Sequence, residues 1–184
     1  MPRAIRLTGL FSLLLALLAG AAILAFVETQ EAQGAQNLGA AELGFLANLN
    51  AYRAQNGLDP IVLNDSLNDA ARWLAQDSAD HDYSGHTDSL KRDMSTRLKA
   101  LIQPFPFAKW SENVAAGFRD ADSVIKAWKG SPPHNANMLG PYNVIGIALV
   151  CKSGTTYGCY WATDYGFLPG DVPPTHGGTA QPTT

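Results

Sequence analysis

The spacing of apolar residues changes along the chain, from a helical pattern in the first two thirds to a strand-like pattern near the end. Over residues 41–56, Leu46 and Leu49 fall on one face of a predicted helix, which Gly57 ends. The same spacing predicts three further helices. The first starts at Asn64 or Asp65 and ends before a loop over residues 81–87, and the last covers residues 121–128. The helix between them covers residues 89–102, and its predicted buried residues are Leu90, Met94, Leu98 and Leu101.

Two apolar runs later in the chain have the pattern of strands. Residues 144–150 and 157–164 are predicted to form one antiparallel hairpin. A further strand has two candidates, residues 61–63 and the segment near Val114. Because helices precede strands without regular alternation between them, the pattern favours the α+β fold class.

The chain begins with an export pattern. Arg3 and Arg6 precede a run without charged residues that begins at Leu7 and ends at Val27. This run is longer than the ~15 residues of a usual signal-peptide core and close to the ~20 that span a bilayer. Residues 1–27 are therefore either a cleaved signal peptide or a retained membrane anchor, and both alternatives place the rest of the chain outside the cytoplasm.

Composition divides the remainder into three parts. Residues 28–39 are predicted to be a linker, and residues 40–167 are predicted to form one domain, long enough for a real core. Residues 168–184 are rich in Pro, Gly and Thr and are expected to be disordered. The formal net charge is −3 and the basic residues are scattered, which argues against nucleic-acid binding. We expect a monomer.

The two cysteines, Cys151 and Cys159, lie on either side of a short polar segment. A hairpin centred near Thr155 would place them opposite each other, within disulfide reach. An exported protein meets oxidising conditions, which favours the disulfide over two free thiols. The spacing is not that of a metal-binding knuckle.

Three ionisable residues are candidates for chemistry. His86 sits in a polar loop, Glu112 precedes a run of small residues that indicates burial, and His134 follows two prolines in what is predicted to be a stiff loop. Two imidazoles and a carboxylate make a partial metal site of the kind that zinc enzymes use, or a hydrogen-bonded cluster without metal. Their separation in sequence means that no single helix can bring them together.

Other residues lead to weaker expectations. Asn113 is predicted to tie its own turn together, and Asp164 is a candidate for the mouth of a cleft. Ser131 and His134 have the spacing of a nucleophile and its base, but no third member of such a set is evident. The four tryptophans, Trp73, Trp110, Trp128 and Trp161, are expected in the core.

Several short motifs occur in a characteristic order: Asn50-x-x-Arg53, Gly57-Leu58-x-Pro60, Asn64-x-x-Leu67-x-x-Ala70-Ala71, His86-Thr-Asp-Ser, Ser111-Glu-Asn-Val-Ala-Ala-Gly117, Trp128-x-x-Ser-Pro-Pro-His134-x-x-Asn137-Met-Leu and Ile145-Gly-Ile-Ala. Together they resemble the CAP superfamily of cysteine-rich secretory, antigen 5 and plant pathogenesis-related 1 proteins, and its small bacterial members in particular. The resemblance spans residues 43–165.

This resemblance implies an α-β-α sandwich around a small antiparallel sheet. It also implies a central cleft lined by two histidines and two acidic residues, which binds a divalent cation in several relatives. His86, Glu112 and His134 match three of those positions, with His81 as a rival to His86. Lys129-Gly130-Ser131 stands where eukaryotic relatives carry the second acid, so a site for Zn, Ca or Mg would be incomplete here.

Three functions are compatible with these features. We favour an extracellular binding module whose cleft holds a cation, a small lipid, a peptide or a partner protein. A metal-dependent hydrolase would use Glu112 as general base or ligand together with the two histidines, and would make Glu112 and His134 catalytic candidates. A structural protein of the cell envelope, anchored through its N-terminal apolar segment, needs no chemistry in the cleft.

Overall fold

A four-stranded sheet lies at the centre of the protein, in the order β1-β3-β4-β2. The computed structural model describes residues 38–170, and the strands are β1 (Val62–Leu63), β2 (Lys109–Ala116), β3 (Val144–Cys151) and β4 (Cys159–Phe167). The strands β2, β4 and β3 are antiparallel, as expected, whereas the short β1 runs parallel to β3. Both candidates for a further strand are therefore in the sheet, and the sheet is mixed.

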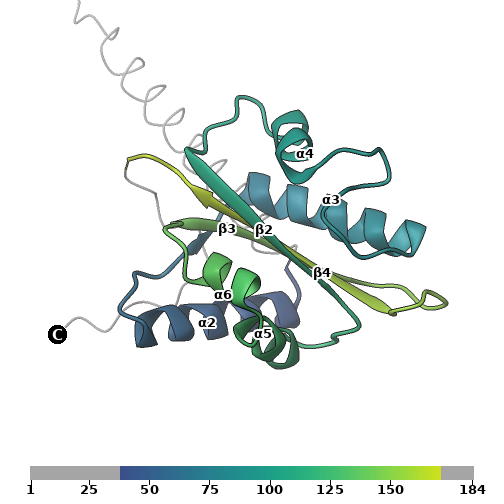
Figure 1. Cartoon of the computed structure of the whole chain (residues 1–184), viewed down its shortest axis with the longest axis horizontal. Helices are drawn as coiled ribbons and strands as arrows, with labels where there is room; N and C mark the ends of the chain where they lie inside the picture. The colour runs from purple at the N-terminus through teal and green to yellow at the C-terminus, as the bar shows by residue number, and fades with distance from the viewer. Residues whose placement is uncertain (1–37, 171–184) are drawn as a thin grey trace, which may run out of the picture. The chain divides into compact units, whose positions relative to one another are not determined.

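Helices cover both faces of this sheet (Figure 1). On one face lie α3 (Asp65–His81) and α4 (Met94–Leu101), and on the other lie α2 (Ala40–Gln55), α5 (Ala121–Lys129) and α6 (Pro132–Met138). The α+β class and the three-layer arrangement are thus confirmed. The strand β2 is at the edge of the sheet, between the two helical layers.

Two helices match the sequence pattern closely. The first predicted helix is α2, shifted by one residue, and the second is α3, capped by Asn64. The Asn64 side chain accepts a hydrogen bond from the backbone N–H of Leu67 at 3.1 Å, which satisfies one of the free donors of the first turn.

The helix predicted over residues 89–102 is shorter than expected, because α4 begins only at Met94. Asp88 accepts hydrogen bonds at 2.8 Å from the backbone N–H and the Nε of Arg92, and Asp93 caps α4. The two aspartate side chains accept hydrogen bonds from backbone N–H groups that a helix would otherwise use. A turn therefore competes with the helix before Met94. Leu90 consequently lies outside the helix and is 64% exposed. Leu101, at the end of α4, is 40% exposed, so the predicted burial of both leucines was wrong.

The segment around His134 was predicted to be a loop, and that prediction was also wrong. Pro132 and Pro133 occupy the first positions of α6. Proline is tolerated there because the first backbone N–H groups of a helix have no partner within it, and because its fixed φ suits the helix. His134 is therefore held on a helix rather than in a loop.

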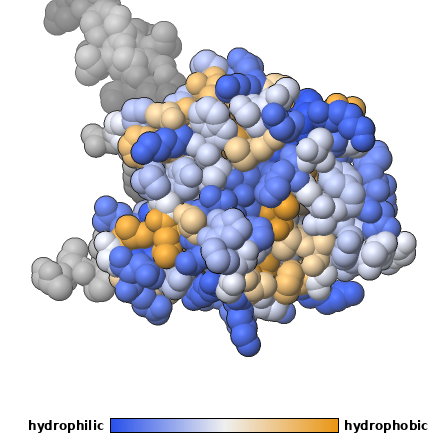
Figure 2. Space-filling view, in the orientation of Figure 1, coloured by the Kyte–Doolittle hydropathy of each residue, from blue (hydrophilic) through white to orange (hydrophobic). Residues whose placement is uncertain are grey.

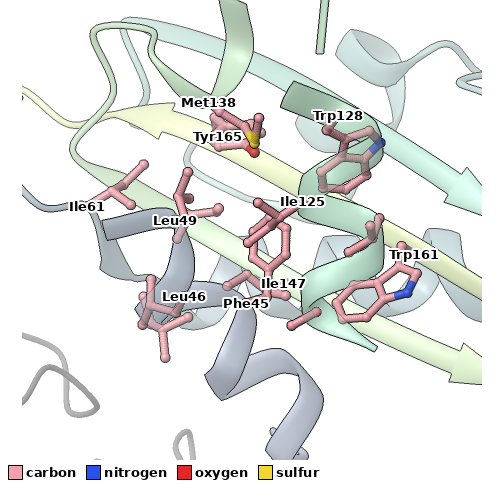
Figure 3. Packing of buried hydrophobic residues seen from close by; sticks show 14 of the residues in the cluster. Phe45, Leu46, Leu49, Ile61, Ile125, Trp128, Met138, Ile147, Trp161 and Tyr165 are labelled. Carbon is pink, nitrogen blue, oxygen red and sulfur yellow. The ribbon is translucent and has the colours of Figure 1, made fainter. Parts of the chain in front are cut away.

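The larger part of the core lies between the sheet and the layer formed by α2 and α5 (Figure 3). Phe45 packs edge-on against Trp128, with 5.5 Å between ring centroids, and lies 5.8 Å from Trp161. Trp128 and Trp161 are buried as predicted, whereas Trp73 and Trp110 are only partly buried.

On the opposite face, α3 lies very close to the sheet. A Cβ built on Gly146 of β3 would overlap the carbonyl of Leu67 in α3. Buried Ala71 and Ala75 line the same helix, so small residues on both elements permit the close approach.

The hairpin formed by β3 and β4 carries the disulfide. Cys151 and Cys159 are direct partners across the two strands, with 4.0 Å between their Cα atoms, and they are bonded to each other. The predicted pairing is confirmed.

Both ends of the chain continue beyond the described residues. The signal or anchor segment and residues 28–37 of the linker lie outside them, as do residues 171–184 of the predicted disordered tail. Leu168, assigned to that tail, exchanges two hydrogen bonds with the Asn143 side chain. Within residues 38–170, no helix has the length and apolarity needed to cross a membrane.

Candidate functional site

Glu112 is a buried carboxylate on the edge strand β2. Side chains alternate between the two faces of a strand, and that of Glu112 points to the face covered by α3 and α4. The residue is 4% exposed. A carboxylate in this position must be paired and hydrogen-bonded to stay ionised.

Arg97 of α4 provides that partner. Its Nη2 donates to Glu112 Oε2, and its Nη1 donates to the backbone carbonyl of His86 at 3.0 Å. The side chains of Arg97 and Glu112 are both 0% exposed. The guanidinium thus joins the carboxylate to the loop that carries His86.

His86 completes the cluster from the loop between α3 and α4. Its Nδ1 lies 2.8 Å from Glu112 Oε1, and the side chain is 55% exposed. The hydrogen bond to Glu112 raises the pKa of His86, against the opposing effect of partial burial. His86 therefore offers a half-exposed imidazole whose orientation is fixed by a buried carboxylate.

Asp164 of β4 lies beside Glu112 as its direct cross-strand partner. Expected at a cleft mouth, it is instead 0% exposed. Burial, and next the charge of Glu112, raises the pKa of Asp164 well above its usual range. Neither of its oxygens receives a hydrogen bond from a donor group in the described residues. Asp164 therefore holds its proton more tightly than an exposed aspartate does.

His134 lies on the other side of β2, on α6. Its Nδ1 is hydrogen-bonded to Ser131 Oγ at 2.8 Å, and its ring stacks on Trp128 with 5.9 Å between centroids. Burial, and then the charge of His86, lowers the pKa of His134. The two histidines thus influence each other electrostatically, but His86 contacts Glu112 whereas His134 contacts Ser131 and Trp128.

Two asparagines tie α6 to β2. Asn113 donates to the backbone carbonyl of His134 at 3.0 Å. Asn137 donates to the carbonyl of Glu112 at 3.0 Å and to Asn113 Oδ1 at 2.8 Å. Asn113 therefore connects a strand to a helix. The sequence had suggested that it would close its own turn, and that prediction was wrong.

A pocket of about 440 Å³ opens beside the buried cluster. The residues that line it are the apolar Met94 and Trp110 and the polar His86, Asp93, Ser95, Ser111 and Glu112. His134 is not among its lining residues. The face of the molecule seen in Figure 2 is mixed, with small apolar patches separated by hydrophilic residues.

The donors present do not fit a divalent cation. Both Glu112 oxygens already accept hydrogen bonds, one from His86 and one from Arg97. The Arg97 charge at the carboxylate opposes a second cation there. Within residues 38–170, His, Cys, Asp and Glu form no group of three or more with the spacing of a metal site.

The rival candidates lie apart from this pocket. His81 ends α3, where its Nδ1 lies 3.0 Å from the carbonyl of Asp77 and 3.1 Å from Asp77 Oδ1. Ser131 and His134 do form a hydrogen-bonded pair. Within residues 38–170 no carboxylate is hydrogen-bonded to His134, so the pair lacks the third group that would orient a catalytic base.

Sequence reasoning missed Arg97 as a member of the site and misplaced Asp164. Arg97 follows Met94 by three residues and precedes Leu101 by four, which places a charged residue on the apolar stripe of α4. Asp164 is an acid inside an otherwise apolar strand. Each is a signal that a buried partner must exist.

A curated protein and two solved structures resemble this chain. The Bacillus subtilis protein YkwD, described as uncharacterized, is 31% identical over 109 residues, which is 59% of this chain and 41% of YkwD. The chain thus spans less than half of that relative. An outer surface protein from Borrelia burgdorferi has a TM-score of 0.58 at 20% identity, covering 67% of this chain and 89% of that protein.

The second structure is an extracellular protein containing an SCP domain from Bacillus anthracis. It also has a TM-score of 0.58, at 19% identity, covering 67% of this chain and 39% of the other. At this identity the structural likeness shows the fold. The sequence profile of the cysteine-rich secretory protein family matches residues 46–165, which is most of the described domain. The chain therefore belongs to the cysteine-rich secretory protein (CAP) family.

Proposed function

We propose that this protein is an extracellular binding domain whose pocket beside His86 takes a small ligand with an apolar part and a polar head. The observation that carries the proposal is the arrangement of the pocket walls. Met94 and Trp110 supply apolar surface, and the His86 ring, fixed by Glu112, supplies a polar group. Pockets of this mixed character bind ligands by apolar contact and orient them by a few polar groups.

Three features support an extracellular location. The N-terminal sequence has an export pattern, and Cys151 and Cys159 form a disulfide, which persists in oxidising compartments. Two of the structural relatives are an extracellular protein and an outer surface protein.

Hydrolysis with Glu112 as general base is less well supported. A general base needs a free lone pair aimed at the water or hydroxyl that it activates. Both oxygens of Glu112 are engaged by Arg97 and His86, and its side chain is 0% exposed. Binding makes no such demand on the carboxylate.

The proposal is tested by titrating the full chain with dodecanoate, dodecanol and dodecylamine while following tryptophan fluorescence. Trp110 lines the pocket, so we expect saturable quenching or enhancement that is lost in Trp110→Phe. His86→Ala removes the polar group and should weaken binding about 10-fold, in line with the loss of a hydrogen bond to a charged group.

His81→Ala is the matched control, because His81 lies at the end of α3 and outside the pocket lining. It should bind with the affinity of the original protein. If none of the three amphiphiles binds, or if both histidine variants bind equally well, the pocket is not the ligand site.

A further inference from the structure

Arg97 is a wholly buried cation behind the pocket. It comes from α4 and contacts Glu112 with one nitrogen and the His86 carbonyl with another. Burying a guanidinium sacrifices much of its hydration, which an anion and further acceptors must offset. The fork of the guanidinium suits this task, because it can bind a carboxylate and a carbonyl at the same time.

The charges around Arg97 are already balanced. Glu112 is the carboxylate that pairs with Arg97, and both side chains are wholly buried. Both Glu112 oxygens are engaged, Oε2 with Arg97 and Oε1 with His86. A divalent cation at this point would have to displace His86 from the carboxylate and to approach a fixed positive charge.

We propose that Arg97 is the built-in cation of this site and takes the place of a divalent metal ion. Arg97 is a positioning residue: it holds Glu112, and Glu112 holds the His86 ring. The site therefore keeps its geometry without a metal. This inference goes beyond the proposed function, because it concerns what organises the site and not what the pocket binds.

The same geometry predicts what happens when the charge of Arg97 is removed. Glu112 would then keep His86 at 2.8 Å and Asp164 as its cross-strand neighbour, without the guanidinium. Carboxyl and imidazole groups are ligands of Zn²⁺ and Co²⁺, and these side chains would have to move together to hold an ion, because they do not have the spacing of a metal site in the present structure. Arg97→Met removes the charge and keeps most of the side-chain volume. Arg97→Lys keeps the charge and is the matched control.

The test uses the full chain of the original protein and both variants. Calorimetry with ZnCl₂ should show no stoichiometric site that depends on Glu112 in the original protein or in Arg97→Lys. Arg97→Met should bind one Zn²⁺ at least about 100-fold more tightly, since the repelling charge is gone. Co²⁺ should give Arg97→Met a visible absorption band that disappears when His86→Ala is added. Thermal melting with Zn²⁺ or EDTA should shift in Arg97→Met alone.

Two results obtained with folded proteins would overturn the inference. The first is a divalent cation bound by the original protein and lost in Glu112→Gln. The second is a folded Arg97→Met that binds Zn²⁺ no better than Arg97→Lys. If Arg97→Met does not fold without metal, refolding with Zn²⁺ should rescue it. Failure of that rescue, while Arg97→Met/Glu112→Gln folds, would equally contradict the inference. Amphiphile binding is measured separately, so its failure leaves these outcomes unaffected.

Discussion

At the scale of single residues, the site is governed by how a few buried charges are neutralised. Glu112 receives hydrogen bonds from Arg97 and His86, whereas burial and the charge of Glu112 raise the pKa of Asp164 beside it. His86 is the member of the set that reaches solvent and whose ordinary pKa lies near neutral pH. It therefore couples the buried cluster to the pH of the medium.

This coupling predicts that the stability contributed by His86 depends on pH. The folded-state pKa of His86 is raised, so the folded protein binds a proton more tightly than the unfolded chain. The contribution is fully present below the unfolded pKa of about 6.5 and is lost as the pH rises through the higher folded pKa. His86→Gln should thus lower the free energy of unfolding more at about pH 5.5 than at about pH 8.5.

Urea unfolding of the original protein and of His86→Gln at both pH values measures this difference. The pKa of His134 is lowered in the folded state, so His134 changes stability in the opposite direction over a neighbouring pH range. Because the original protein and His86→Gln both contain His134, the difference between their free energies of unfolding removes much of the His134 contribution. A cost of substitution that stays constant with pH would show that the contact with Glu112 does not favour the protonated ring.

At the scale of elements, sequence patterns located the helices and strands well where local signals and packing agree. Asn64 begins α3 as predicted, and the two cysteines meet across the hairpin. The pattern failed where side chains compete with the helix for backbone hydrogen bonds. Because the Asp88 and Asp93 side chains accept backbone hydrogen bonds, α4 begins later than predicted, at Met94. Pro132 and Pro133, which were expected to keep the chain in a loop, are instead the first residues of α6.

The close contact between α3 and β3 gives a prediction at this scale. Gly146→Ala would push a methyl group into the backbone of α3 at Leu67, so either the helix or the strand must move. Overpacking of this kind costs about 1–3 kcal/mol, and more where backbone rather than side chain is in the way. Denaturant unfolding of Gly146→Ala measures the loss in the free energy of unfolding.

Gly44→Ala is a matched control for this substitution. Gly44 lies within α2, and an added Cβ there would meet the Ala121 methyl group at 3.6 Å, an ordinary contact. Because alanine favours helix over glycine by about 1 kcal/mol, Gly44→Ala should leave stability unchanged or raise it. Equal losses in both variants would mean that α3 does not pack on Gly146 as described.

At the scale of the whole molecule, the site joins the two helical layers across the edge strand β2. His86 and Arg97 come from the layer of α3 and α4, whereas His134 and Asn137 come from α6. The sequence identified His86, Glu112 and His134 through a family resemblance, because motifs record which residues occur together. It could not show that His134 comes from α6, in the other helical layer, since that depends on how the helices pack on the sheet.

The disulfide gives a prediction that concerns the whole chain. Cys151 and Cys159 close a short loop, and breaking their bond should cost about 2–3 kcal/mol by freeing the unfolded chain. The folded hairpin has a second attachment, because Asp82 at the end of α3 accepts hydrogen bonds from the Tyr160 hydroxyl at 2.6 Å and from the Thr156 side chain at 2.7 Å. We therefore expect Cys151→Ser/Cys159→Ser to lower the unfolding midpoint in urea while leaving amphiphile affinity at the pocket unchanged. Adding Asp82→Ala to that double variant removes these two hydrogen bonds as well and should increase hydrogen exchange in residues 151–159. If Cys151→Ser/Cys159→Ser alone already weakened amphiphile binding, the end of the hairpin and the pocket would be coupled through the sheet. That result would contradict the expectation that the Asp82 hydrogen bonds hold the hairpin end independently of the pocket.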